Sequence, residues 1–147
     1  MRAFVFNLES VRRLRDHAER KAREEVAREL GAREQHAAEL ARRIDAVDEA
    51  RDGARSAHPS ARAQWHALVE RRRLEQLQAQ HALEEQDERV DESRVRATDA
   101  ARQHEIITRL EQRRRAEHAR AVEQAQEAEL GEIATSAYVR NQKAAGA

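Results

Sequence analysis

The sequence predicts an all-α protein, a long antiparallel two-helix coiled-coil hairpin with unequal arms and a C-terminal single-helix overhang. Three observations predict this fold. Charged residues make up 38% of the 147 residues and aromatic residues 3%, a balance typical of long helices rather than of a spherical core. Pro59 is the only proline. On both sides of it, apolar residues recur every three or four positions, which is the period of a helix face.

The first helix is predicted from about residue 7 to about residue 53. Asn7 is a suitable N-cap residue, and Glu9 places a carboxylate in the first helical turn. Apolar residues then keep the helical spacing up to the first turn signal. They are Leu8, Val11, Ala18, Ala22, Val26, Leu30, Ala37, Leu40, Ile44, Val47 and Ala54.

The one strong break covers about residues 53–60. Gly53 suits a helix C-terminal cap, and Pro59 followed by Ser60 suits the start of a new helix. The second helix is predicted from about residue 60 to about residue 140, with a weak point at Gly131 and a frayed tail at residues 141–147. We expect residues 1–147 to form a single coiled-coil domain.

The two predicted helices can pack against each other along most of the length of the first helix. A turn centred near residues 56–57 brings most large apolar residues of the first arm opposite apolar residues of the second, and a disordered chain has no reason to show such a match. The expected pairs are Leu30 with Leu83, Ala37 with Leu77, Leu40 with Leu74, Ile44 with Val69, Val47 with Trp65 and Leu68, Val26 with Val90, and Ala18 with Val95. At the open end, Phe4, Phe6 and Leu8 are expected to meet Ile106, Ile107 and Leu110.

Residues 111–140 have no counterpart in the first arm and form the predicted overhang. A lone helix gains little stability from intrinsic propensity, so an apolar stripe on it indicates a bound partner. The larger apolar residues of the predicted overhang are Val122, Leu130, Ile133, Tyr138 and Val139.

No pattern in the sequence predicts an enzyme, a metal site or a cofactor site. The chain has no cysteine, and its seven histidines are scattered. His104 and Glu105 begin like a zinc-protease motif, but Thr108 stands where its second histidine is needed. The net charge is zero, which argues against nucleic-acid binding. No apolar run is long enough for membrane insertion, and the N-terminus lacks a signal peptide, so we expect a cytoplasmic protein.

Trp65 is the only tryptophan and lies close to the hairpin tip. It has two interpretations: its ring packs over the loop against Val47, or it anchors a partner together with Leu68 and Val69. Tryptophan is enriched among residues that dominate binding energy, which keeps the second interpretation open.

Two ends of the chain carry a resemblance to a known family. The opening Phe4-Val5-Phe6-Asn7-Leu8-Glu9-Ser10-Val11, with Arg15 following, resembles the start of FliJ-family flagellar export proteins. Three later segments are similar to the C-terminal region of that family: Leu110-Glu111-Gln112-Arg113-Arg114, Leu130-Gly131-Glu132-Ile133-Ala134 and Tyr138-Val139-Arg140. The unequal hairpin and the chain length also fit.

The resemblance implies a non-enzymatic component of the flagellar type III export apparatus. Members of that family are antiparallel coiled coils similar to the central stalk of rotary ATPases. They associate with the export ATPase FliI, with the membrane export-gate protein FlhA, and with export chaperones. Such a protein would be peripheral on the cytoplasmic face of the membrane through its partners.

On this basis we expect two partner-binding regions. The predicted overhang, with Val122, Leu130, Ile133, Tyr138 and Arg140, would face the ATPase. The tip, with Trp65 and Leu68, would face the export gate. The alternatives are a generic cytosolic coiled-coil scaffold, in which the overhang pairs with its own copy, and the equivalent stalk of a virulence secretion system.

Overall fold

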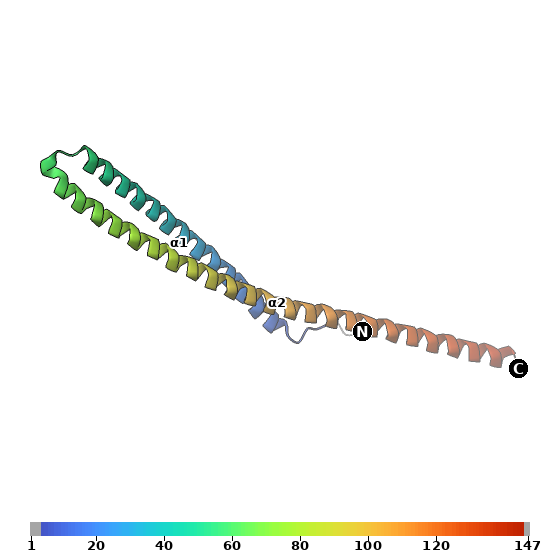
Figure 1. The fold of residues 1–147 in the computed structure, drawn as a ribbon. Coiled ribbons are helices and arrows are strands. Elements are labelled where there is room, and N and C mark those ends of the chain that lie inside the picture. Colours follow the sequence, from blue (N-terminus) through green and yellow to red (C-terminus); the bar gives the residue numbers. More distant parts are fainter. Residues whose placement is uncertain (1–3, 146–147) are drawn as a thin grey trace. The chain divides into compact units, whose positions relative to one another are not determined.

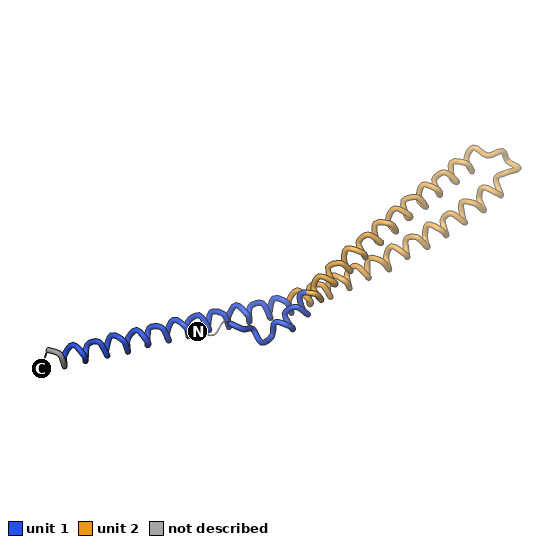
Figure 2. The backbone as a smooth tube through the Cα atoms, turned by 180° about the vertical axis from the view of Figure 1, so that it is seen from behind, with its two compact units in different colours: residues 1–16, 103–147 blue, residues 17–102 orange. Residues whose placement is uncertain are grey.

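The structure is a computed structural model that describes residues 4–145 and the side chains of residues 4–142. Helix α1 spans Glu9–Ser56, a 3-10 helix η1 spans Pro59–Ala61, and helix α2 spans Arg62–Ala145 (Figure 1). The two long helices pack against each other as an antiparallel hairpin. The predicted fold class is therefore confirmed. The described residues fall into two compact units, shown in Figure 2: residues 17–102, and residues up to 16 together with residues from 103 onward.

Helix α1 begins two residues after the predicted cap. The carbonyl of Leu8 accepts the first helical hydrogen bond, from the Arg12 amide at 2.9 Å, so Leu8 and not Asn7 occupies the N-cap position. In the first turn, the Glu9 carboxylate accepts hydrogen bonds from the guanidinium groups of Arg12 at 2.8 Å and Arg13 at 2.9 Å. These bonds, the one from Arg12 first, lower the pKa of Glu9 to about 2.

Helix α1 continues past Gly53 and ends at Ser56. The hydroxyl of Ser56 donates to the carbonyls of Asp52 at 3.0 Å and Gly53 at 3.3 Å, which satisfies acceptors of the last turn. Residues 57 and 58 make the connection, and the carbonyl of His58 then accepts from the amide of Ala61 at 2.9 Å to open η1. Pro59 suits this first position because it needs no amide donor.

Gly53 is not a cap, and the reason is a close approach by Trp65. A Cβ atom at position 53 would lie 2.5 Å from Cη2 and 2.8 Å from Cε3 of the indole ring. Any larger residue would displace the ring, so the absence of a side chain lets Trp65 pack directly on the α1 backbone.

At the other end, α2 is helical to Ala145. Residues 141–145, expected to fray, therefore belong to the helix, and the last two residues of the predicted tail lie outside the described part of the chain.

The hairpin unit, residues 17–102, buries small apolar residues together with polar ones. Val47, Ala50, Val69 and Val90 form its buried apolar seam. Three polar side chains are buried among them, namely Glu19, Gln86 and Ser93. Buried polar groups need hydrogen-bond partners, and among the described residues no buried side-chain nitrogen or oxygen lacks one.

Polar bonds cross from helix to helix along this seam. The amide of Gln86 donates to the carbonyl of Glu29 at 3.0 Å and to its carboxylate at 2.6 Å. Ion pairs also cross it: Arg43 with Glu75 at 2.9 Å, Arg33 with Asp87 at 2.5 Å, and Arg96 with Glu25 at 2.8 Å.

These contacts show that the predicted register was wrong. The predicted turn centre would place Glu70 opposite Arg43 and Ser60 opposite Gly53, but Arg43 pairs with Glu75 and Gly53 meets Trp65. Both partners lie five positions further along α2. The turn sits later because α1 runs on to Ser56.

The later turn leaves several predicted seam residues outside. Leu74 is 61% exposed and Leu77 is 52% exposed, so neither is buried in the seam as the expected pairs with Leu40 and Ala37 required. Leu30, Ile44 and Val95 are exposed as well. On α1, the seam includes Glu29 and Arg43 instead of their neighbours Leu30 and Ile44. A shift of one residue turns a side chain by about 100° around the helix, which moves these apolar groups to its flank.

The other unit joins the N-terminal segment, residues 4–8, and the start of α1 to α2. Arg12 pairs with Glu111 at 3.3 Å, and Arg15 donates a hydrogen bond to the side chain of Gln103. Phe6 is buried. The expected meeting of the N-terminal segment with Ile106 was wrong in position, since Ile106 is exposed and Phe4 lies further along α2.

Candidate partner-binding surface

The N-terminal segment covers α2 as far as His118. The ring of Phe4 packs edge-on against the ring of His118, with centroids 5.6 Å apart and an interplanar angle of 62°. The guanidinium carbon of Arg115 lies 5.6 Å from the centroid of the same phenyl ring, a cation–π geometry. The cover therefore extends beyond Leu110, where the sequence-based prediction placed its end.

The distal segment of α2, defined here as residues 119–142, carries exposed apolar side chains. Leu130 is 65% exposed, Ile133 57% and Tyr138 63%, and Val139 is also exposed. Val122 is half-buried. Because α1 begins at Glu9 and lies beside α2 near Glu111, the described part of the chain offers this segment no second helix.

The distal segment has one apolar stripe. Val122, Leu130 and Ile133 follow a spacing of three and four residues that also takes in Gln126 and Ala137, so they lie on one face of the helix. Arg140 follows Ile133 by seven residues, two turns, and ends the stripe. The stripe starts four residues after His118, so it continues the face of α2 on which Phe4 packs.

Tyr138 is not part of this stripe. It follows Ala137 directly, which turns its side chain by about 100° away from the stripe. Its hydroxyl accepts a hydrogen bond from the side-chain amide of Gln142 at 3.0 Å. The structure thus brings Val122, Leu130, Ile133 and Arg140 onto one face and places Tyr138 beside it.

The charged residues change from a mixture of basic and acidic to acidic alone where the intrachain cover ends. Before residue 119, arginines form pairs along α2 with acidic residues four positions away: Arg109 with Glu105, Arg113 with Glu117, and Arg115 with Glu111. From residue 121 to residue 139 the sequence has no arginine or lysine. It has four glutamates, all exposed: Glu123, Glu127, Glu129 and Glu132. The sequence-based prediction missed this acidic stretch.

The second predicted region, near the hairpin tip, has a more internal role for Trp65. The indole ring is half-buried and packs on Gly53. Together with Ala46, Glu49, Ala50, Leu68 and Arg72 it lines a shallow cleft of about 220 Å³. Val69 is buried and lines a separate cleft with Arg51, Ala54, Arg55, His66, Glu70 and Arg73, so Trp65 and Val69 do not share a surface patch.

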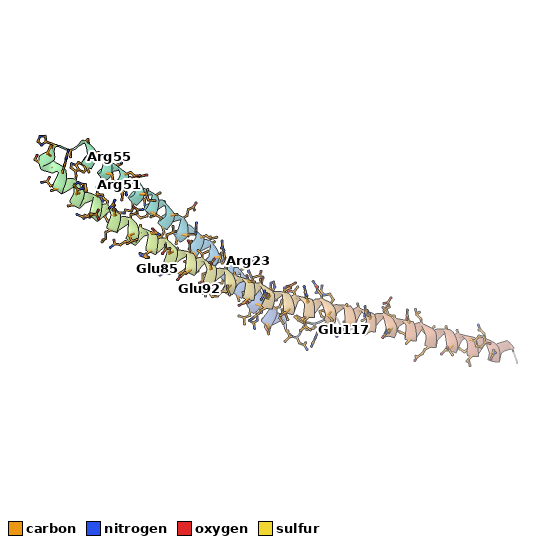
Figure 3. The ribbon with its side chains drawn as sticks, viewed as in Figure 1. Arg23, Arg51, Arg55, Glu85, Glu92 and Glu117 are labelled. Atoms are coloured by element: carbon orange, nitrogen blue, oxygen red, sulfur yellow. The ribbon has the colours of Figure 1, made fainter. Side chains whose placement is uncertain are left out.

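The rest of the hairpin surface is charged, with residues such as Arg23, Arg51, Glu85 and Glu92 along both helices (Figure 3). Among the described residues, no three His, Cys, Asp or Glu side chains are placed to hold a metal ion. In the described part of the chain, no helix combines the length and apolar character needed to cross a membrane.

The distal segment is thus a described surface with apolar side chains on one face and no second helix beside it. Comparisons with protein-family models, with curated proteins and with solved structures found no match to this chain.

Proposed function

We propose that this chain is a non-enzymatic stalk and general chaperone of a bacterial flagellar type III export apparatus, linking the export ATPase FliI to the membrane gate protein FlhA. The observation that carries the proposal is the distal segment, a stretch of α2 with an apolar stripe and no second helix beside it. The resemblance of both chain ends to FliJ-family proteins supports it. Association with the cytoplasmic face of the membrane, through the partners, is part of the same proposal.

The surface chemistry fits a stalk inside a ring of subunits. Most ion pairs on the two helices are exposed, as for Arg94 with Asp91 and Arg73 with Glu70. Exposed pairs contribute less than about 1 kcal/mol each, so such a surface does not bind one subunit permanently. The apolar side chains of the distal segment supply the stronger contact. In this proposal the distal segment binds the ATPase and the cleft beside Trp65 and Leu68 binds the gate.

The ATPase contact is tested with two matched double variants. Leu130→Ser/Ile133→Ser removes the exposed apolar pair of the distal segment. Leu74→Ser/Leu77→Ser removes a pair with the same spacing and similar exposure in the hairpin unit. We expect the first variant to bind purified export ATPase at least about tenfold more weakly in calorimetry, and the second to bind like the wild type. Equal affinities for all three proteins would refute this part of the proposal.

The gate contact is tested with Trp65→Ala/Leu68→Ala in a pull-down with the cytoplasmic domain of the gate protein. We expect this variant to lose the gate and to keep the ATPase, because the mutated side chains lie in the hairpin unit. Circular dichroism of the variant checks that the hairpin is intact. Full retention of gate binding by a folded variant would remove the tip from the proposal.

A further inference from the structure

The apolar stripe of the distal segment is bordered by glutamates on both edges. Each residue turns the helix by about 100°, so Glu123 and Glu127 lie along one edge of the stripe and Glu129 along the other. Glu132 lies further round on the side of Glu129. All four side chains are exposed, and no basic residue stands among them in the sequence. From residue 121 to residue 139 the stripe is therefore an apolar contact surface within a negative field, and Arg140 stands at its end.

This charge pattern argues against a second copy of the chain as the occupant. An antiparallel pairing that matches the stripe to itself sets Val122 opposite Ala137 and Leu130 beside its own equivalent. The same pairing sets each edge of the stripe beside the same edge of the other copy, so Glu129 lies next to its own equivalent. A parallel pairing sets the edge with Glu123 and Glu127 beside the opposite edge, with Glu129 and Glu132, of the other copy. Like charges directly opposite each other are unfavourable, so self-association is penalised in both arrangements.

The same field argues against two other classes of partner. Anionic membrane surfaces attract basic segments, and nucleic acids are bound through Lys and Arg contacts to phosphates. A helix face with four glutamates and no basic residue over residues 121–139 repels both. The occupant must be a protein surface of opposite charge.

The hairpin itself shows how such glutamates are satisfied. Beside its seam, acidic side chains of one helix pair with arginines of the other: Glu75 with Arg43, Asp87 with Arg33, and Glu25 with Arg96. The distal segment has the acidic half of this arrangement, next to the face that Phe4 covers up to His118. The basic half is not supplied by the described part of the chain.

We propose that the distal segment docks in an apolar groove or against an apolar helix face that is edged with lysine or arginine on another protein. Leu130 and Ile133 fill the apolar contact, and Glu123, Glu127, Glu129 and Glu132 pair with the basic edge. The inference rests on the proposed function only in treating the distal segment as the partner-binding end. It adds the chemistry that the partner surface must have.

The test uses the full chain and two synthetic helical peptides as probes. Both peptides have leucine at the core positions of about four heptads, and one carries lysine and the other glutamate at the flanking positions. We expect fluorescence anisotropy to show binding of the lysine peptide and none of the glutamate peptide. Raising the salt concentration should weaken that binding, because exposed charge pairs are screened. Equal binding of the two peptides would overturn the proposal.

Two matched quadruple variants locate the binding site. The first variant replaces four glutamates of the distal segment by glutamine: Glu123, Glu127, Glu129 and Glu132. It should bind the lysine peptide at least about tenfold more weakly, and its binding should no longer depend on salt concentration. The same substitution at Glu84, Glu85, Glu88 and Glu92, exposed glutamates of the hairpin unit, should leave binding unchanged. The variant Leu130→Ser/Ile133→Ser should also fail to bind the lysine peptide, although the helix content of the protein stays unchanged. If the two quadruple variants behave alike, the proposal is wrong.

Repeating these measurements with purified export ATPase separates the two proposals. If binding of the lysine peptide requires the four glutamates but binding of the ATPase is unaffected by substitutions in the distal segment, the proposed function fails and the inference of a basic partner surface stands. If ATPase binding requires Leu130 and Ile133 but neither the ATPase nor the peptide responds to the glutamates, the function stands and the inference fails.

Discussion

Replacing Gly53 by alanine tests the packing of the hairpin tip. In the structure the Trp65 ring occupies the space that a side chain at position 53 would need. Gly31 provides a matched control, because it also lies inside α1 and a Cβ atom there would meet nothing within 4 Å. The two substitutions have the same effect on helix propensity and differ only in what the new methyl group contacts.

The expected difference in the free energy of unfolding follows from two terms. Alanine is more favourable than glycine inside a helix by about 1 kcal/mol, so Gly31→Ala should stabilise the protein by about that amount. Gly53→Ala has the same gain, but its methyl group would lie 2.5 Å from Cη2 of Trp65, and such overpacking costs about 1–3 kcal/mol. Gly53→Ala should therefore range from neutral to about 2 kcal/mol destabilising.

Urea unfolding followed by far-UV circular dichroism and by fluorescence measures both quantities. Trp65 is the only tryptophan, so its emission reports directly on the displaced ring. Gly31→Ala should raise the unfolding midpoint and leave the emission unchanged. Gly53→Ala should shift the emission to longer wavelength, because the ring becomes more exposed. If Gly53→Ala stabilises the protein as much as Gly31→Ala and keeps the emission, the packing argument is refuted.

Three further predictions concern other parts of the chain. Hydrogen bonds from Arg12 and Arg13 lower the pKa of Glu9 from 4.5 to about 2. The folded protein therefore binds this proton more weakly than the unfolded chain does. The contribution of Glu9 to folding stability is present above about pH 4.5 and should be lost as the pH falls towards 2. Thermal unfolding across this range measures it, and Glu9→Gln should flatten the dependence. Phe4→Ala should speed amide hydrogen exchange near Phe6, because its contacts with Arg115 and His118 are removed; a Phe4→Ala exchange pattern identical to that of Val5→Ala, at a 75% exposed position, would contradict the packing. Gln86→Ala should lower the free energy of unfolding in urea by about 1–3 kcal/mol, because buried hydrogen bonds to Glu29 are lost. Ser93→Ala should be nearly neutral, since the Ser93 hydroxyl donates to Val90 in its own helix. Equal losses in the two variants would contradict this assignment.

The hairpin could be predicted from the sequence, but the exact turn could not. Pro59 and the apolar spacing fix two helices and one break. Gly53 was interpreted as a cap because glycine commonly ends helices. The alternative use of glycine, to let another group approach the backbone, depends on a residue twelve positions away in the other helix. Local sequence does not reveal that contact.

The register error has a similar cause. Leu40 and Val47 belong both to the predicted apolar set and to the observed seam phase, so the apolar pattern alone fits either one. In one rotation of α1, Leu30 and Ile44 face the seam. In the other rotation, their neighbours Glu29 and Arg43 face it. The observed phase gives Glu29 and Arg43 cross-helix partners, in Gln86 and Glu75. Such polar bonds across a seam are invisible to a pattern of apolar residues.

The candidate surface was predicted in part. The spacing of Val122, Leu130 and Ile133 indicated one face of the helix, and the structure places them on one face, with Leu130 and Ile133 exposed and Val122 half-buried. Tyr138 was grouped with them by proximity in the sequence, although it lies off the stripe. The acidic edges were missed because the total net charge of zero conceals four glutamates gathered in ten residues.

The antiparallel pairing and the polar residues of the seam have a consequence for folding during synthesis on the ribosome. Contacts join residues that are ever further apart in sequence from the tip outward: 32 positions for Arg43 with Glu75, 71 for Arg96 with Glu25, and 88 for Arg15 with Gln103. Closing a short loop costs less entropy than closing a long one, so the hairpin should zip from its tip. The ribosome releases the N-terminal residues first, yet their partners are synthesised last. During that interval the 48-residue first helix has no mate, and charged groups such as Arg43 keep its inner face from aggregating.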